Sequence, residues 1–288
     1  RTGDPATVRD AYISAALSET GCVPTQFDSQ VFGDATFALT ESPGFVTLAM
    51  LIQAESGGSA LAMPLDFSLP IMGDLLQAAS HLEDRGIAHG DLTENSIYIT
   101  PDMRALVADF RGACLVASED ESLDCSSFGS ALVGSAYRHA PEMVDGHPND
   151  VANNMWQLGL IFARMCFGGP APTQLEGLSS SHQFKKKRNQ LPGQLAPEDR
   201  TREGRRRIRE GIRAGFSVQD SAPFLSLYPD YKDLMELLAS MLEPDPARRV
   251  SARQAITWLQ SAATRRKVAL PRVRPPTALP PAWYDDWQ

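Results

Sequence analysis

The stretch HGDLTENSIYI, from His89 to Ile99, and the shorter stretch DFRGA, from Asp109 to Ala113, decide how this chain is expected to fold. Two apolar runs, IYIT and ALVADF, connect them, and the four residues PDMR between the runs begin with a Pro-Asp pair. Because Pro and Asp favour tight turns, the pattern predicts a β-hairpin. The hairpin would join two aspartates, Asp91 and Asp109, which are 18 residues apart in the sequence.

Three more segments follow in a fixed order. GSAYRHAPE ends at Glu142, NMWQLG begins at Asn154 within a helical pattern of apolar residues, and MLEPDPARRVS ends at Ser251, before the last expected helix. Together with the two aspartate stretches, this series resembles the protein kinase fold over most of residues 60–262. The resemblance implies an α+β, bilobal fold with a reduced, strand-rich N-lobe and a helical C-lobe.

The resemblance also implies roles for individual residues. Asp91 matches the catalytic-loop aspartate that accepts the proton of the substrate hydroxyl, and Asp109 matches the aspartate that holds magnesium. Ser96 stands at the position of the second metal ligand, which is an asparagine in the family pattern. Asn95 lies one position too early, where its side chain would point in another direction.

Four positions match structural elements of the family. The resemblance implies an ion pair between Glu142 and Arg249, which would join the end of the activation segment to a distal helix. If that pair is buried, loss of one partner would cost about 3–5 kcal/mol, because it leaves a buried charge unpaired. Trp156 and Gly159 match the motif of the core helix, although its usual aspartate is Asn154 here.

Departures from the family pattern concentrate in the two aspartate stretches. Gly90 replaces the arginine that grips a phosphorylated activation segment, and Thr93 replaces a lysine. Arg111 replaces the glycine of the metal-binding triplet and places a cation beside Asp109, where it would compete with a metal ion. Ser96 still offers a hydroxyl, so the loss of the second metal ligand is serious but not absolute.

The region before residue 60 lacks the phosphate-binding parts of the family. It has no GxGxxG loop, and no lysine occurs before Lys185. Arg1 or Arg9 could replace the lysine in principle, and Glu19 is an uncertain match for its glutamate partner. The missing elements are either deleted or outside the sequence given. Loss of several electrostatic contacts at once would slow phosphoryl transfer by many orders of magnitude.

Local patterns predict three segments, namely a reduced N-lobe over 1–63, a C-lobe over 64–262 and a Pro-rich tail over 263–288. Apolar spacing predicts helices over 5–18, with Asp4 as the N-cap, and over 72–84. The runs FVTLAMLI and SALAMPL, within 31–65, are expected to be strands, with the hinge between the lobes at Ala62–Pro64.

The composition excludes some functions. The net charge of −8 argues against a general nucleic-acid or anionic-membrane binder, although 11 Lys or Arg against 4 acids give residues 185–213 a charge of +7. The four cysteines form no zinc-binding pattern, and Cys114 and Cys125 are close enough in sequence either to pair or to remain free thiols. No apolar run reaches membrane-spanning length.

Among kinase-like families, the HGD triplet, the absent glycine loop and the Pro-rich tail resemble secreted rhoptry-type kinases of coccidian parasites. The match is to their no-glycine-loop branch, which includes a bradyzoite pseudokinase. The resemblance implies a pseudokinase that is secreted into the parasitophorous vacuole or cyst wall, binds protein partners and needs no cofactor. The alternatives are a divergent serine/threonine kinase that uses ATP and magnesium, and a structural component of an extracellular matrix.

Two surfaces are candidates for partner binding. One is the basic segment 185–213, and the other is the aromatic cluster Trp283, Tyr284 and Trp287 in the tail. Each also has a simpler interpretation, since the basic segment can be a solvated loop and the tail can pack against the C-lobe.

Overall fold

The computed structural model describes residues 5–32, 35–56, 63–121, 123–128, 138–145, 147–167 and 229–272. In chain order, the elements are α1 (Pro5–Leu17), η1 (Ser18–Thr20), β1 (Gln26–Phe32), β2 (Ala35–Thr40), α2 (Leu48–Ser56), α3 (Leu65–Asp84), β3 (Ile87–Ala88), β4 (Ile97–Ile99), β5 (Ala105–Val107), η2 (Phe110–Gly112), β6 (Cys114–Leu115), η3 (Cys125–Phe128), α4 (Pro141–Val144), α5 (Val151–Phe167), η9 (Pro229–Tyr231), α9 (Lys232–Met241) and α10 (Ala252–Arg266). The mixture of helices with a few short strands confirms the expected α+β fold class.

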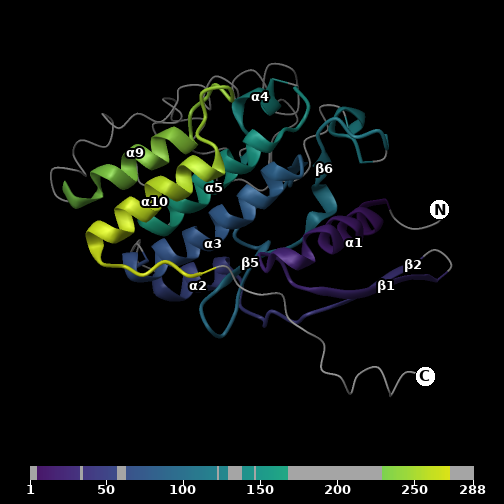
Figure 1. Ribbon diagram of the computed structural model, residues 1–288, viewed down its shortest axis with the longest axis horizontal. Coiled ribbons are helices and arrows are strands. Elements are labelled where there is room, and N and C mark those ends of the chain that lie inside the picture. Colours follow the sequence, from purple (N-terminus) through teal and green to yellow (C-terminus); the bar gives the residue numbers. More distant parts are fainter. Residues whose placement is uncertain are drawn as a thin grey trace, which may run out of the picture.

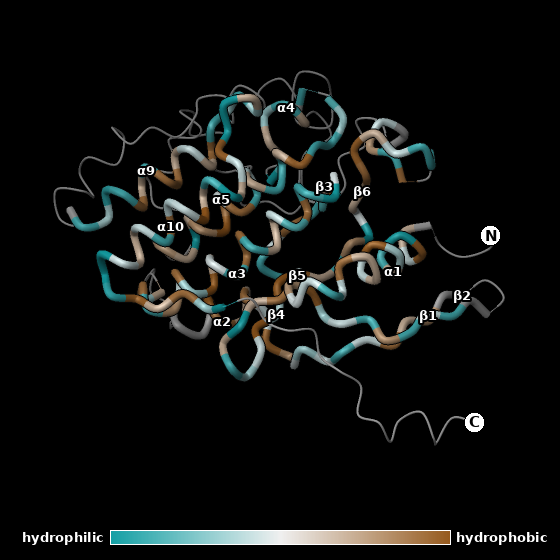
Figure 2. Tube along the Cα trace, in the orientation of Figure 1, coloured by the Kyte–Doolittle hydropathy of each residue, from teal (hydrophilic) through white to brown (hydrophobic). Residues whose placement is uncertain are grey.

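The elements fall into two groups. Helices α3, α5, α9 and α10 pack side by side, whereas α1 and the β1–β2 hairpin extend to the other side of the molecule (Figure 1). Hydrophobic residues concentrate where α3, α5 and β5 meet, and the outer loops are largely hydrophilic (Figure 2). Strands pair only in two-stranded antiparallel sheets within the described residues, as β1–β2, β3–β6 and β4–β5. The β4–β5 pair is the hairpin that the sequence predicts.

The N-terminal helix agrees with its prediction, because α1 covers Pro5–Leu17 and buries Ile13 and Leu17 on one face. Its predicted N-cap, Asp4, lies outside the described residues. The basic segment 185–213 and the aromatic cluster in the tail also lie outside them.

The strand prediction for FVTLAMLI is wrong, because this run enters helix α2. Leu48 and Ile52 are buried and stand one helical turn apart, so the run has a helical apolar face. Periodicity alone cannot separate a short buried strand from a buried helix. The end of SALAMPL is wrong as well, since Leu65 begins α3, which starts seven residues before the predicted position.

Residues 46–49 form backbone hydrogen bonds to segments much further along the chain. The amide of Ile99 donates to the carbonyl of Val46 (2.8 Å), and the amide of Ala49 donates to the carbonyl of Glu94 (3.0 Å). These bonds attach residues 46–49 to the hairpin β4–β5 and to the loop before it. Of the hinge expected at Ala62–Pro64, Ala62 lies outside the described residues, so the boundary between the lobes stays a prediction.

Helix α5 forms the centre of the helical group. A Cβ added to Gly159 would lie 2.8 Å from Cδ2 of Leu242 and 3.1 Å from Cβ of Met241, so a larger residue would push α9 away. Trp156, on the same helix, is buried and lies under the guanidinium carbon of Arg249, which is 5.2 Å from the ring centroid. Both residues pack the core.

Glu142 and Arg249 form a two-pronged ion pair between α4 and the segment before α10. The nitrogen–oxygen distances are 2.6 Å and 2.9 Å, and only 1% of the Arg249 side chain is exposed. The guanidinium also donates to the carbonyls of Ala152 (3.0 Å) and Glu243 (2.9 Å). The arginine thus joins the start of α5 to two neighbouring loops.

The N-terminal part of the activation segment carries a further covalent link. Cys114 and Cys125 form a disulfide, whereas Cys22 and Cys166 are buried free thiols. Of the alternatives that the spacing of Cys114 and Cys125 left open, the structure has the paired one. Within the described residues, no helix is long and apolar enough to cross a bilayer.

We expect Arg249→Met to lower the free energy of unfolding by about 3–5 kcal/mol, because it leaves the Glu142 carboxylate without its buried partner. The matched control is Arg253→Met, which removes an exposed pair with Asp84 (2.7 Å) and should cost at most about 1 kcal/mol. Urea unfolding followed by far-ultraviolet circular dichroism measures both. Equal losses in the two variants would contradict a structural role for the buried pair.

Candidate active site

Two buried amide side chains of α5 form hydrogen bonds to the backbone of the loop that begins at His89. Asn154 accepts from the amide of His89 (2.9 Å) and donates to the carbonyl of Ile87 (2.8 Å). Gln157 accepts from the amide of Leu92 (3.1 Å) and donates to the carbonyl of Gly90 (3.2 Å). Each side chain satisfies one donor and one acceptor of the loop, which a carboxylate cannot do. No sequence motif pointed to Gln157.

Asp91 lies in this loop and is half-buried. Burial raises the pKa of Asp91, Arg138 opposes that shift, and the charge of nearby Asp109 adds to it. The charge of Asp109 is therefore close enough to influence the carboxyl group of Asp91. Arg138, however, places a cation beside the carboxylate that would serve as the base.

Ser96 is committed to the loop itself. Its hydroxyl donates to the carbonyl of Thr93 (2.9 Å) and accepts from the Thr93 amide (2.9 Å). The residue is buried, and its own carbonyl accepts from the amide of Ala108 (2.9 Å). The hydroxyl's proton and one of its lone pairs are thus engaged in closing a turn, and the side chain is buried.

Asp109 is paired with an arginine two residues further along the chain. Arg111 donates to both carboxylate oxygens, with Nε–Oδ1 and Nη2–Oδ2 distances of 2.5 Å and 2.8 Å. Hydrogen bonding from Arg111 holds the pKa of Asp109 below its ordinary value, although partial burial opposes the shift. Both oxygens that would bind a metal ion are occupied by the protein's own guanidinium.

Helix α1 fixes the segment that carries this pair. Arg9 donates to the carbonyl of Arg111 (2.9 Å), and Asp10 accepts from the amide of Phe110 (2.6 Å). Burial raises the pKa of Asp10, partly offset by the hydrogen bond from Phe110. The sequence analysis offered Arg9 as a substitute for the phosphate-binding lysine. In the structure its side chain instead bonds the backbone of the DFR segment, Asp109–Arg111.

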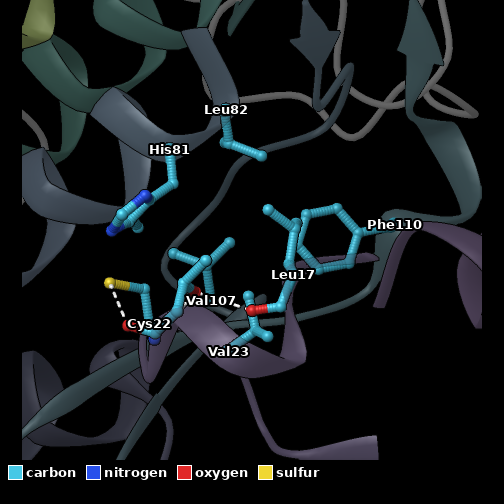
Figure 3. A pocket seen from close by; sticks show the side chains of 9 residues that line it. Leu17, Cys22, Val23, His81, Leu82, Val107 and Phe110 are labelled. Atoms are coloured by element: carbon cyan, nitrogen blue, oxygen red, sulfur yellow. Dashed lines mark hydrogen bonds between the residues drawn. The ribbon is translucent and has the colours of Figure 1, made fainter. Parts of the chain in front are cut away.

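Phe110 anchors the same segment in the interior. Its ring is fully buried and lies 4.9 Å from the ring of His89. Figure 3 shows Phe110 beside Leu17 and Val107 around a narrow apolar gap, with Cys22 at its far end. Burial raises the pKa of Cys22 to about 11, so its thiol is protonated at neutral pH. Apolar packing thus holds the triplet on its inner side while α1 holds its backbone.

Gly90 is fixed by its backbone surroundings. Its φ is +82°, and an added Cβ would lie 2.2 Å from the carbonyl oxygen of Gly112. This distance is shorter than any real contact of a side-chain carbon, and the conformation favours glycine. An arginine therefore does not fit here without moving the DFR segment. The glycine at position 90, in place of the family's arginine, is therefore required by the local backbone conformation.

Glu94 is a buried residue that the sequence did not single out. Its carboxylate pairs with Arg138, which precedes α4, and with Arg164 of α5 at 3.3 Å. Only 2% of its side chain is exposed. Through these two ion pairs, Glu94 connects the loop at His89 to the end of the activation segment, at Arg138, and to the core helix α5, at Arg164. A buried carboxylate is costly without such partners.

These residues do not fit a magnesium site. Arg111 donates to both carboxylate oxygens of Asp109, and the hydroxyl of Ser96 is engaged with Thr93. Within the described residues, no group of three or more His, Cys, Asp or Glu side chains is arranged to hold a metal ion. The arrangement can position a half-buried carboxylate, Asp91, but it supplies no free anionic ligand to a nucleotide-bound cation.

His89 gives the site a dependence on pH. Its Nε2 lies 3.2 Å from the carbonyl of Ala108, and burial lowers the pKa of His89 from 6.5 to about 4. As the pH falls, the unfolded chain binds the proton below about 6.5, whereas the folded chain binds it only near 4. Stability is therefore lost as the pH falls through this window, by about 3 kcal/mol.

We expect His89→Gln to reduce this acid-dependent loss, because an amide can keep the bond to Ala108 and does not titrate. Urea unfolding at a series of pH values between about 7 and 4.5 measures the effect. His147→Gln, at an exposed position, is the matched control. An unchanged slope in the His89 variant would show that other groups carry the pH dependence.

Comparison with known proteins identifies the family of this chain. A family model for the protein kinase domain matches residues 60–258. Mitogen-activated protein kinase 2 of Pneumocystis carinii is 29% identical over 184 residues, which are 63% of this chain and 50% of that protein. Serine/threonine-protein kinase PAK 5 of Rattus norvegicus is 33% identical over 96 residues, which are 33% of this chain and 12% of that protein.

The chain thus spans half or less of the length of these relatives. Residues before 60, which include α1 and the β1–β2 hairpin, lie outside the matched region. The match itself covers more than half of the chain and contains the HGD loop, the DFR segment, the Glu142–Arg249 pair and the core helix. This protein belongs to the protein kinase domain family.

Proposed function

We propose that this protein is a pseudokinase, a kinase domain that has lost phosphoryl transfer and works by binding other proteins. The observation that carries the proposal is the two-pronged pairing of Asp109 with Arg111. In a kinase, the corresponding carboxylate bridges a metal ion to the nucleotide phosphates. Here the guanidinium supplies the positive charge internally, so the carboxylate needs no external cation.

Three other features support the same conclusion. The Ser96 hydroxyl is engaged with Thr93, Arg138 lies near Asp91, and α1 holds the DFR segment through its backbone. The sequence before residue 60 also lacks a lysine and a glycine-rich loop. Positioning and electrostatic stabilisation supply most of the rate enhancement in phosphoryl transfer. Each of these losses therefore lowers the expected rate of that reaction.

The finer placement rests on the sequence resemblance to rhoptry-type kinases. It supports secretion into the parasitophorous vacuole or cyst wall, action through protein partners and no requirement for a cofactor. The basic segment 185–213 is a candidate for one partner surface, because its charge of +7 contrasts with the net charge of −8 of the whole chain.

A divergent serine/threonine kinase is the second candidate, and one observation favours it. Asp91 remains half-buried beside Asp109, which is the arrangement that a proton-accepting carboxylate needs. The Asp109–Arg111 pair is exposed enough to open, since 63% of the Arg111 side chain and 43% of the Asp109 side chain are accessible. ATP and magnesium would be its cofactors.

A thermal-shift titration with ATP and magnesium separates the two candidates. We expect no change in melting temperature at millimolar nucleotide, because Arg111 occupies the carboxylate oxygens of Asp109. A ligand at about 100 times its dissociation constant would add about 2.7 kcal/mol to the free energy of unfolding, which is easily measured.

Two variants sharpen this test. Arg111→Gly frees the Asp109 carboxylate, and we expect it alone not to restore nucleotide binding, because the clamp on the phosphates is also missing. Asp109→Asn is the matched control for metal dependence. A stabilisation of the unmodified protein by ATP and magnesium that disappears in Asp109→Asn would favour the kinase and contradict the pseudokinase.

A further inference from the structure

A second concave site lies away from the paired aspartates. It is an open cleft of about 710 Å³ between the loop after β6, the segment before α5 and the turn before α10. The loop after β6 and α4 stand at the same end of the molecule (Figure 1). None of Asp91, Ser96 and Asp109 lines the cleft. Its properties are therefore independent of the candidate active site.

The lining combines apolar surface with negative charge. Val116, Pro148, Ala152 and Pro246 supply apolar surface, and Asp124 and Asp150 supply carboxylates. No Lys or Arg is found among the described residues of the lining. Glu142 also contributes, but Arg249 balances its charge.

The two unbalanced carboxylates are held in place by backbone donors. Asp124 accepts from the amide of Ser126 (2.6 Å), and Asp150 accepts from the amide of Ala152 (3.0 Å). Hydrogen bonding from Ser126 lowers the pKa of Asp124, so this carboxylate is ionised at neutral pH. Three further acids, Glu119, Asp120 and Glu121, are exposed on the same loop as Asp124.

The walls of the cleft are connected to one another. The Cys114–Cys125 disulfide closes the loop that carries Asp124, and an isolated β-bridge joins Leu115 to Asp124. The side-chain amide of Asn149, in the neighbouring wall, lies 3.7 Å from Sγ of Cys114. A ligand would meet a surface that is already assembled, so little ordering of the cleft itself opposes its binding.

We propose that this cleft binds a basic segment of a partner protein, in which Lys or Arg side chains alternate with apolar ones. The apolar lining would cover the apolar side chains, while Asp124 and Asp150 would pair with the cations. The same carboxylates would repel the phosphates of a nucleic acid or an anionic membrane. The inference does not depend on whether Asp109 binds a metal ion, because the two sites share no residue.

The test uses the full chain and a fluorescein-labelled octapeptide of alternating Arg and Leu, followed by fluorescence anisotropy. An octapeptide of alternating Glu and Leu is the control for charge. We expect the basic peptide to bind and the acidic peptide not to bind. Absence of binding by the basic peptide overturns the proposal.

Paired variants locate the binding. Asp124→Asn combined with Asp150→Asn keeps the oxygen acceptors for the backbone amides and removes two charges, and we expect about tenfold weaker binding. Asp28→Asn combined with Asp66→Asn makes the same change in net charge at exposed positions outside the cleft and should leave affinity unchanged. Equal weakening by both pairs would show non-specific attraction and overturn the proposal.

A third variant and a competition experiment complete the test. Ala247→Trp fills the cleft from an exposed position, and we expect it to abolish binding without lowering the melting temperature. Replacing Lys185, Lys186 and Lys187 with serine tests the chain's own basic segment. Tighter peptide binding after that change would show that the chain's own basic segment occupies the cleft. Dimers in sedimentation that depend on these charges would show that the occupant is a second copy of this chain. Either result overturns the proposal of a separate partner.

Discussion

The rest of the site depends on the hydrogen bonds that join α5 to the loop at His89–Leu92. Asn154 and Gln157 are fully buried, and each joins one backbone donor and one backbone acceptor of the loop to the core helix. A buried amide is stable only when both of its ends are paired, so the loop cannot shift without stranding polar groups. Asp91 is presented at a fixed place for this reason.

The same helix also receives the ion pairs that close the structure around the loop. Arg164 reaches Glu94 in the loop, and Arg249 lies over Trp156 while it holds Glu142. Since each pair is at least partly buried, its geometry is restrained by desolvation as well as by attraction. These polar contacts to one central helix add to the packing of the hydrophobic core.

Phosphoryl transfer needs cations from outside the protein, and this chain supplies cations of its own. Arg111 donates to both carboxylate oxygens of Asp109, and Arg138 lies near Asp91 while it pairs with Glu94. Internal guanidinium groups are covalently attached, so they compete with a dissolved metal ion at a high effective concentration. The proposed pseudokinase function follows from this substitution, and the acidic cleft offers a separate way to recognise a partner.

The sequence by itself determined the order of the landmarks and the hairpin between the two aspartates, because these depend on short motifs and on turn chemistry, which are local. The pairing of Glu142 with Arg249 joins residues far apart in the chain, so it was expected only from the resemblance to the protein kinase fold. The structure corrected the strand expected at FVTLAMLI, because burial on one helical face, and not the run of apolar letters, decided its conformation.

Only the tertiary structure decided what the side chains of the site do. Ser96 reads as a possible metal ligand, but a turn uses its hydroxyl, and Arg9 reads as a possible clamp, but it serves the DFR backbone. Gln157 and Glu94 carry no motif, and their importance depends on partners far away in the sequence. Motifs record which residues stand in order along the chain, whereas the state of a hydroxyl, carboxylate or guanidinium depends on what folding places within hydrogen-bond distance.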